Sequence, residues 1–576
     1  MQDATQVARA LEETAALLEF AGAARFKVKA YEQAARVVRA LGDELGPLVE
    51  QARLRGLQGI GAALSRQISE LWNTGASDLL LELRRQHPEG AAELVKIEGL
   101  TPRRIRALHA ALAIRSVDEL SAACAAGRVR GVPGFGEKTE QRLLAACERW
   151  RHRAAPAAPR LIMSRALELA ASIQGALAEV VEETHLAGAL RRGVETVDEL
   201  ELVVVGDVAA ALRHLSGLRR VLRVDLDERV AHLSDGVPLK LHAAEGDLGT
   251  RLLLATGNTA HVQAVRLRAE SHGFSLDGAP LAMTPSGCAR LPARAFTSEA
   301  DLYRALGLSF VPPELREGHA ELEDAARGGF SDLITASDVQ GMVHCHTTYS
   351  DGKNSIAEMA SAAHALGMKY ITITDHSPSA HYAGGVSLDR LKQQWDDIAA
   401  AQERVPIRIL RGTESDILID GSLDFPDVVL EQLDVVIASI HARHRLDRVA
   451  MTERLVRAMS LPLFKIWGHA LGRILNHRAP IDCDVPAVLD ALASSRGAVE
   501  LNADPHRMDL PPAFIPAARS RGIPFVISVD AHSTRGFEVL GYGITMARRG
   551  GVRKIEVLNT ASAEAFMARV RPVCRS

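Results

Sequence analysis

The chain has 576 residues, 47% hydrophobic and 24% charged, with a formal net charge of −3. That length predicts several domains, and that balance is ordinary for globular protein, which argues against a disordered or fibrous chain. No basic leader precedes an apolar segment and no apolar run reaches membrane-spanning length, so the sequence argues against a membrane protein. The six cysteines form no Cys-x-x-Cys pair, which favours a reduced, cytoplasmic protein.

The charge is unevenly distributed along the chain. Residues 1–160 carry 24 Lys and Arg against 19 Asp and Glu, a net charge of +5, which leaves −8 for the remainder. We therefore expect any nucleic-acid contact to lie at the front of the chain.

Residues 1–150 have helical composition and contain three short Gly-rich segments, at 57–61, 97–102 and 132–138. A Gly-x-Gly hairpin between two helices resembles the helix-hairpin-helix, which binds DNA backbone without reading sequence. The glycines allow close backbone approach, and the N–H groups that open the next helix meet a phosphate oxygen. A helix-terminating glycine is the alternative for any single copy, and the middle copy has Thr101 in place of the second glycine. The candidate DNA contacts are Gly59, Gly61, Gly134, Gly136 and Lys138.

An Ala/Pro-rich basic linker at 151–160 precedes a second region, at 161–315. Its Gly188-Ala189, its Arg191-Arg192-Gly193 and its strand Glu199-Leu-Glu201 resemble the nucleotidyltransferase palm of the family X DNA polymerases. In that family two Mg²⁺ ions are held by an Asp-x-Asp pair and a third Asp. The resemblance implies an α+β palm at this place in the chain.

This palm departs from its relatives at the metal-binding positions. Glu199 and Glu201 align with the Asp pair, Lys240 aligns with the third Asp, and Ala189 replaces a serine whose hydroxyl touches the triphosphate. Mg²⁺ requires near-ideal octahedral geometry, so one extra methylene misplaces the ion. An ammonium ~4 Å from a dication costs several kcal/mol. We therefore expect no productive Mg²⁺ binding and an inactive polymerase site.

The last third of the chain contains seven apolar runs of strand type separated by segments of helical composition, which argues for a parallel barrel. The first run ends in His344-x-His346, and five more end in metal-ligand residues. Because the carboxyl ends of parallel strands meet at one end of a barrel, these side chains are expected to converge. The candidates at the run ends are His344, His346, His376, Glu414, His441, His469, Asp530 and His532, and Asp351 follows in a turn after the first run.

These residues resemble the complete motif set of the polymerase-and-histidinol-phosphatase (PHP) phosphoesterases, whose fold is a distorted seven-stranded β/α barrel. The resemblance implies up to three divalent ions. His344, His346, Glu414 and Asp530 would hold the first, and Glu414 would bridge to a second held by His441 and His469. Asp351, His376 and His532 would hold the third. Imidazole and carboxylate ligands suit Zn²⁺, Mn²⁺ or Fe²⁺.

Arg443, Arg473 and Arg507 follow barrel strand ends and resemble the family's phosphate-side arginines, with surface salt bridges as the alternative for each. We assign catalysis to the metal-holding set of His344, His346, Glu414, His441 and Asp530. Asp375, which precedes His376, is expected to support a ligand without binding metal.

Together the resemblances cover essentially the whole chain, which is identified as a bacterial family X DNA polymerase homologue. We expect a multidomain α/β protein: an all-α helix-hairpin-helix domain at 1–150, a palm-like α+β region at 161–315 and a distorted (β/α)₇ barrel at 336–576.

The predicted function is a metal-dependent 3′–5′ exonuclease or 3′-end-processing enzyme of DNA repair, with abasic-site endonuclease cleavage as a further candidate activity. The expected partner is gapped, nicked or 3′-ended duplex DNA, and the expected state is a cytoplasmic monomer. The alternatives are an active gap-filling polymerase with 3′–5′ exonuclease, a small-molecule phosphatase and a non-catalytic DNA scaffold.

Overall fold

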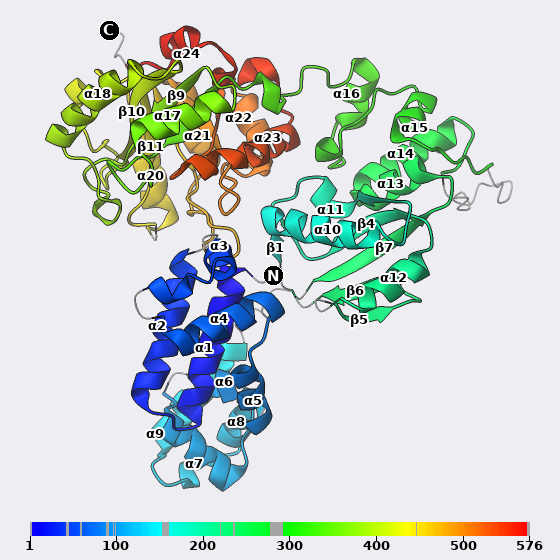
Figure 1. Ribbon diagram of the computed structural model, residues 1–576, viewed down its shortest axis with the longest axis vertical. Coiled ribbons are helices and arrows are strands. Elements are labelled where there is room, and N and C mark those ends of the chain that lie inside the picture. Colours follow the sequence, from blue (N-terminus) through cyan, green and yellow to red (C-terminus); the bar gives the residue numbers. More distant parts are fainter. Residues whose placement is uncertain are drawn as a thin grey trace. The chain divides into compact units, whose positions relative to one another are not determined.

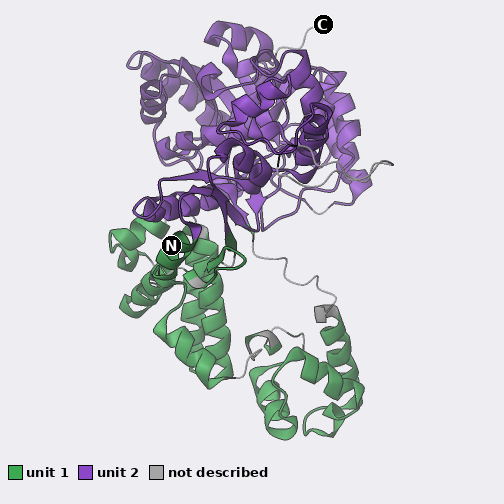
Figure 2. Cartoon of the chain, turned by 90° about the vertical axis from the view of Figure 1, so that its right-hand side faces the viewer, with its two compact units in different colours: residues 1–160, 209–239 green, residues 161–208, 240–576 purple. Residues whose placement is uncertain are grey.

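The computed structural model describes residues 3–41, 45–57, 60–87, 91–95, 97, 99–151, 160–218, 221–233, 235, 237–276, 292–444 and 446–572. The chain divides into two compact units, Met1–Arg160 with Ala209–Leu239, and Leu161–Val208 with Lys240–Ser576 (Figure 2). The expected domain boundaries stay predictions. Among the described helices none is both long and apolar enough to cross a membrane.

The N-terminal part of the first unit is all helical, as expected. Buried apolar side chains from Ala4 to Cys147 form one cluster that joins its helices. Several helices begin at a capping side chain that accepts from a backbone N–H of the first turn: Asp3 from Gln6, Ser77 from Leu80 and Ser116 from Glu119. The elements are α1 (Ala4–Phe20), α2 (Arg25–Leu41), α3 (Leu45–Glu50), η2 (Leu54–Gly56), α4 (Ala62–Thr74), α5 (Asp78–Gln86), α6 (Ala91–Leu94), α7 (Pro102–Leu112), α8 (Val117–Ala125), η3 (Val129–Gly131) and α9 (Glu137–Arg151).

The palm-like region is built on a five-stranded sheet in the order β2-β4-β7-β6-β5. Its strands are β2 (Glu183–Leu186), β4 (Leu200–Val205), β5 (Val221–Asp225), β6 (Val230–Leu233) and β7 (Pro238–Ala244), and β1 (Leu161–Ile162) pairs separately with β3 (Thr196–Val197). The helices are α10 (Met163–Leu177), α11 (Gly188–Arg191), α12 (Val208–Ser216), α13 (Leu248–Thr256), α14 (Thr259–Ser271), α15 (Glu299–Ala305) and α16 (Glu321–Arg327), with η4 (Pro313–Leu315) and η5 (Ala336–Asp338).

The C-terminal part is the expected parallel barrel of seven strands, in which sequence neighbours pair from β8 to β14. The barrel closes between its first and last strands, where Val529 N donates to Val343 O at 3.2 Å and His346 N donates to Ala531 O at 2.9 Å. Its helices lie around the strands (Figure 1). The strands are β8 (Gly341–Cys345), β9 (Tyr370–Ile373), β10 (Arg408–Asp416), β11 (Val435–Ser439), β12 (Lys465–Trp467), β13 (Gly497–Asn502) and β14 (Phe525–Ser528).

The barrel helices are amphipathic segments between these strands, and the last of them contributes to the inner core. Phe566 and Val570 of the final helix pack in one buried cluster with Val343, Leu410 and Val526 from three strands. The helices are α17 (Ile356–Ala365), α18 (Leu388–Gln402), α19 (Asp427–Leu430), α20 (Arg448–Met459), α21 (Val485–Ala493), α22 (Ile515–Arg519), α23 (Leu540–Arg549) and α24 (Ala563–Val570), with η6 (His381–Ala383), η7 (Pro512–Phe514), η8 (Thr534–Val539), η9 (Lys554–Glu556) and η10 (Leu558–Thr560).

One buried charge lies among these strands, away from the strand ends that carry the predicted ligands. Lys465 opens β12 and is fully buried, and its Nζ donates to Leu461 O at 2.6 Å and to Ser495 Oγ at 2.8 Å. Burial and, to a smaller extent, the nearby Arg496 together lower the pKa of Lys465 to about 7. No carboxylate is among its hydrogen-bond partners in the described part of the chain.

Lys465 predicts a pH dependence of stability. Because its pKa is lower in the folded than in the unfolded chain, the unfolded chain holds the extra proton between about pH 7 and 10. The free energy of unfolding should therefore rise with pH in that window, by up to about 1.4 kcal/mol per pH unit from this group. Denaturant unfolding of Lys465→Met should lack that increment, while Lys392→Met, on the exposed face of α18, should keep it. Equal slopes for the two variants would contradict the assignment.

Candidate metal centre

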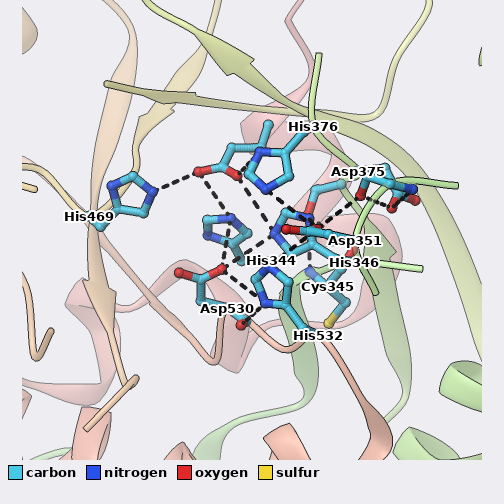
Figure 3. A network of polar contacts seen from close by, with 12 residues as sticks. His344, Cys345, His346, Asp351, Asp375, His376, His469, Asp530 and His532 are labelled. Carbon is cyan, nitrogen blue, oxygen red and sulfur yellow. Dashed lines mark hydrogen bonds and ion pairs between the residues drawn. The ribbon is translucent and has the colours of Figure 1, made fainter. Parts of the chain in front are cut away.

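The nine predicted ligands converge at the carboxyl ends of the barrel strands, and the carboxylate of Glu414 lies at their centre. Figure 3 shows the side chains of His344, His346, Asp351, His376, His469, Asp530 and His532 gathered there. Its Oε1 lies 2.8 Å from His469 Nε2, 3.2 Å from His441 Nε2 and 3.4 Å from His344 Nε2. Its Oε2 lies 2.9 Å from His376 Nδ1. Glu414 is 1% exposed, so these imidazoles replace water as its surroundings.

Two further carboxylates complete the cluster. Asp530 Oδ1 lies 3.5 Å from His344 Nε2 and 3.4 Å from His346 Nε2. Asp351, in the turn after β8, has its Oδ1 3.4 Å from His532 Nε2 and 3.6 Å from His376 Nε2. Glu414 is buried and the Asp530 side chain is 5% exposed, whereas Asp351 is open to solvent. The cluster therefore has a buried side and an accessible side.

The geometry groups these residues differently from the expected partition. Among the described residues, the sets that could share an ion are His344, His346 and Asp530; His376, Glu414 and His441; and His346, Asp351, His376 and His532. His376 was expected only with Asp351 and His532, but its Nδ1 faces Glu414 while its Nε2 faces Asp351. Sequence spacing cannot distinguish the two nitrogens of an imidazole, and each nitrogen here faces a different carboxylate.

The donor set fits divalent cations. Among the described residues, His344 Nε2, both ring nitrogens of His346, His376 Nδ1 and Glu414 Oε2 are buried and make no hydrogen bond of normal geometry, although His376 Nδ1 and Glu414 Oε2 lie 2.9 Å apart as an ion pair. Leaving a buried polar atom without a hydrogen bond costs about 1–3 kcal/mol, and a shared ligand would compensate this cost. Imidazole nitrogens and carboxylate oxygens aimed at a common centre are the ligands that Zn²⁺, Mn²⁺ and Fe²⁺ take.

The electrostatics of the cluster favour positive charge. Burial lowers the pKa of His376, but the carboxylates of Glu414 and Asp351 outweigh it and raise the pKa to about 10. Burial also lowers the pKa of His441, but the carboxylates of Glu414 and Asp416 outweigh it and raise the pKa to about 9. Burial raises the pKa of Glu414, yet the neighbouring imidazoles bring it well below its ordinary value. A field that stabilises imidazolium in this way also stabilises a bound cation.

Three of the predicted ligands have backbone conformations that L-residues rarely adopt. His344 has φ +65°, Asp530 +50° and His469 +23°, and at His344 the pairing of β8 with β9 shifts register. Such left-handed residues cost of order 1–3 kcal/mol and persist only where the surroundings hold them. The bulge at His344 directs two histidines of one strand into the same cluster.

Two supporting residues were not predicted from the sequence. Glu500 Oε1 accepts from His344 Nδ1 at 2.5 Å and from Ser528 Oγ at 2.7 Å, and Asp416 Oδ1 lies 3.1 Å from His441 Nδ1. Each leaves the Nε2 atom of its histidine facing Glu414, which is how carboxylates orient metal-binding imidazoles. Glu500 is enclosed within an apolar strand, and a fully buried Glu is the signal that could have identified it.

Asp375 lies beside the ligands, as expected of a supporting residue. Its Oδ1 accepts from Thr347 N at 2.8 Å and from Ser350 Oγ at 2.5 Å, and its Oδ2 accepts from Gln394 Nε2 at 2.6 Å. These bonds fix the turn that leads from His346 to Asp351.

The three predicted arginines have different surroundings. Arg507 Nε lies 3.5 Å from Asp530 Oδ2, so its guanidinium borders the cluster. Arg443 is exposed and adopts φ +60°. Arg473 is only 9% exposed; its Nε donates to Arg507 O at 2.8 Å, and its NH2 atom lies 3.2 Å from Glu195 Oε1. The structure thus commits Arg473 to internal contacts rather than to an open phosphate site.

The predicted polymerase site holds no group with metal-ligand geometry among the described residues. Glu201 Oε2 lies 2.7 Å from His242 Nε2, and Glu199 and Lys240 are exposed. Gly188 has φ +64°, and a Cβ added to it would lie 2.3 Å from Glu201 Oε1. The position before Ala189 therefore requires glycine.

The two arginines of this site are occupied. Arg191 pairs with Glu299 at 2.7 Å, and Arg192 donates to Thr256 O and is 3.7 Å from Glu317 Oε1. Both guanidinium groups therefore have acidic or carbonyl partners within the protein.

The three hairpins of the N-terminal region share one turn. Ile60, Leu100 and Phe135 each donate a backbone N–H to the carbonyl three residues earlier, at 3.0–3.1 Å. Nothing lies within 4 Å of a Cβ placed at Gly61, Gly134 or Gly136, and Lys138 is exposed. In the middle copy Thr101 accepts from Arg104 N at 3.3 Å, which uses one of the N–H groups that a phosphate would need. Gly59 lies outside the described residues.

Comparison with known families agrees with this arrangement. Residues 3–77 match the helix-hairpin-helix domain, 91–149 the SAM-like helix-hairpin-helix tandem, 251–317 the DNA polymerase beta thumb and 343–503 the PHP domain. The matches therefore cover the hairpins, part of the palm-like region and most of the metal cluster.

Curated relatives fall into two groups. The DNA polymerase/3′-5′ exonuclease PolX of Bacillus subtilis (strain 168) is 33% identical over 581 residues, which cover 98% of this chain and 99% of that protein. A probable phosphatase of Thermoanaerobacter sp. (strain X514) is 27% identical over 38% of this chain and 89% of its own, and one of Aeromonas hydrophila is 29% identical over 33% of this chain and 76% of its own.

The central position of Glu414 predicts its effect on metal content. Glu414→Gln keeps the shape of the side chain but removes the negative charge that faces four imidazoles, so at least one divalent ion per chain should be lost. Elemental analysis after dialysis measures this, and Glu403→Gln, on the exposed end of α18, is the matched control. An unchanged metal content in Glu414→Gln would show that this carboxylate holds no ion.

Proposed function

The chain belongs to the bacterial family X DNA polymerases, and from that premise we propose that it is a DNA repair enzyme that acts through its PHP barrel as a metal-dependent 3′–5′ exonuclease. The observation that carries the proposal is the convergence of eight imidazole and carboxylate side chains around buried Glu414. Zn²⁺, Mn²⁺ and Fe²⁺ are the candidate ions, up to three per chain. Cleavage at abasic sites is a further candidate activity of the same centre.

The proposed mechanism divides the work between metal-holding and phosphate-facing residues. Bound divalent ions would lower the pKa of a coordinated water and offset charge on the phosphate oxygens. Glu414 and Asp530 would hold ions together with the histidines that face them, while Glu500 and Asp416 fix which imidazole nitrogen is presented. Arg507 borders the cluster, where its guanidinium can meet a phosphate oxygen of the scissile bond. Arg443 is a second candidate for that role.

DNA binding is assigned to the hairpins of residues 1–150. The open space beside Gly61, Gly134 and Gly136 supports close approach of a phosphate to the backbone, and the charge of the region supports a polyanion. We expect gapped, nicked or 3′-ended duplex as substrate and a cytoplasmic monomer as the working state. Among the described residues, Cys124, Cys147, Cys345 and Cys483 form no disulfide bond.

The polymerase site is proposed to be inactive. Glu201 is engaged by His242, Arg191 by Glu299, and Lys240 stands where the family has its third Asp. A cation at a ligand position opposes Mg²⁺ binding rather than supporting it. The competing candidate, an active gap-filling polymerase, has the full-length relative in its favour.

A second candidate activity is hydrolysis of small phosphate monoesters, which is favoured by the relatives named probable phosphatases, whose matches cover 38% and 33% of this chain. The hairpins argue for a polymeric substrate. Rates on end-labelled duplex and on p-nitrophenyl phosphate, measured with the same metal-loaded protein, separate the two.

Cleavage should depend on the barrel ligands. His344→Ala or Asp530→Asn removes a side chain that faces the buried cluster, so release of nucleotides from a 3′-labelled duplex should fall at least about a hundredfold. Duplex affinity should change little, because binding is assigned to residues 1–150. Asp396→Asn, on the exposed face of α18, is the control. Near wild-type cleavage by both ligand variants would refute the assignment.

Template-directed synthesis should be undetectable. Misplaced carboxylates and one added cation withhold about 4 kcal/mol or more of transition-state stabilisation, roughly a thousandfold in rate. Primer extension is measured in an Asp530→Ala background, so that exonuclease does not mask it. Recovery should need at least Glu199→Asp, Glu201→Asp and Lys240→Asp together, with Ala189→Ser as a further step. Robust extension without these changes would show that the polymerase site is active.

A further inference from the structure

Glu195 belongs to the palm-like region but directs its carboxylate at the barrel. It lies between α11 and β3, and its Oε1 is 3.2 Å from the NH2 atom of Arg473, while its Oε2 is 2.6 Å from the NH1 atom of Arg549. The Glu195 side chain is 16% exposed and those of the two arginines 11% each. Burial raises the pKa of Glu195, but Arg549 and Arg473 outweigh it and lower the pKa below its ordinary value. This is a buried ion triad.

Arg473 joins the two loops that follow β12 and β13. Its Nε donates to Arg507 O at 2.8 Å, and its NH2 group donates to Met508 O. Asp509 also joins the two loops, because its Oδ2 accepts from Leu471 N at 3.0 Å and from Arg473 N at 3.4 Å. One guanidinium thus fixes the carbonyls of the loop that carries Arg507.

That loop is the one that places Arg507 against the metal cluster. Arg507 Nε lies 3.5 Å from Asp530 Oδ2 and 3.7 Å from Asp504 Oδ2. Met508 has φ +46°, a conformation that a non-glycine residue keeps only when its neighbours hold it. The hydrogen bond from Arg473 to Met508 O is such a restraint.

We infer that Glu195 is a positioning residue for the barrel site, acting through Arg473 on the loop that presents Arg507 to the scissile phosphate. Without the Glu195 carboxylate, the Arg473 guanidinium keeps, among the described residues, the carbonyls of Arg507 and Met508 as hydrogen-bond acceptors and Asp509 as a nearby carboxylate. A buried guanidinium that loses one of its carboxylates is less well balanced and shifts toward solvent. The loop then loses its restraint. The inference rests on the proposed phosphodiesterase function, and it gives the palm-like region a role in hydrolysis.

The chain offers a matched control. Glu314 also precedes the barrel and pairs with the neighbouring residue of α23, with its Oε1 2.7 Å from Arg548 Nε. The side chains are similarly buried, at 19% and 21% exposed. This pair makes no contact with residues 504–509 among those described. Glu314→Gln therefore removes a comparable ion pair without touching the Arg507 loop.

Hydrogen exchange tests the positioning without metal or substrate. In Glu195→Gln, backbone amides of residues 506–509 should exchange at least about tenfold faster than in the wild type, and in Glu314→Gln they should not. Glu195→Asp, which keeps the charge, should retain most of the protection. If these amides exchange at the same rate in both Gln variants, whether that rate is faster than in the wild type or unchanged, the inference is overturned.

Kinetics test the consequence with a single-stranded oligonucleotide and with bis(p-nitrophenyl) phosphate. Glu195→Gln should raise KM about tenfold and change kcat less than twofold, whereas Glu314→Gln should leave both within twofold. In an Arg507→Ala background, Glu195→Gln should add nothing further. Additive losses would overturn the inference. A wild type that hydrolyses neither substrate would refute the proposed function instead, and the exchange result would still decide the positioning role.

Discussion

The structure depends on one buried carboxylate surrounded by imidazoles. Glu414 is almost fully buried at the centre of the strand ends, and its two oxygens face nitrogens of His344, His376, His441 and His469. A carboxylate in such a place is tolerated only when positive charge balances it. The closed barrel, the bulge in β8 and the supporting carboxylates all follow from the need to bring donors from separate strands to that point.

The sequence predicts much of this barrel because its signals are local. Each strand contains an apolar run, and ligands such as Glu414, near the end of β10, and His469, just after β12, lie at the carboxyl end of their strands, so parallel topology brings them together. Which nitrogen of His376 faces which carboxylate depends on side-chain rotation, and that is not encoded in spacing. Glu500 was not predicted as a supporting residue because it lies inside a strand, where the pattern predicts an apolar residue.

Arg473 shows a different limit of sequence analysis. Its position after β12 suggested an open phosphate contact, but its environment depends on Glu195, 278 residues earlier in the chain. No local pattern encodes such a pairing. The same holds for Arg191 and Arg192 of the palm-like region, whose partners Glu299 and Glu317 come from more than 100 residues away. In this region acidic side chains of the protein balance both arginines, and Arg549 joins Glu317 to Glu195 at the barrel.

The left-handed backbone conformations at His344, His469 and Asp530 place three ligands in the metal centre, and they lower the thermal stability of the barrel. Glycine would relieve the strain at each position, at about 1–3 kcal/mol per residue, but would delete a donor. Selection or engineering for heat resistance alone would therefore tend to erode the centre one donor at a time. A thermostable variant sought without loss of function should leave these three positions fixed and draw its gains from the outer helices.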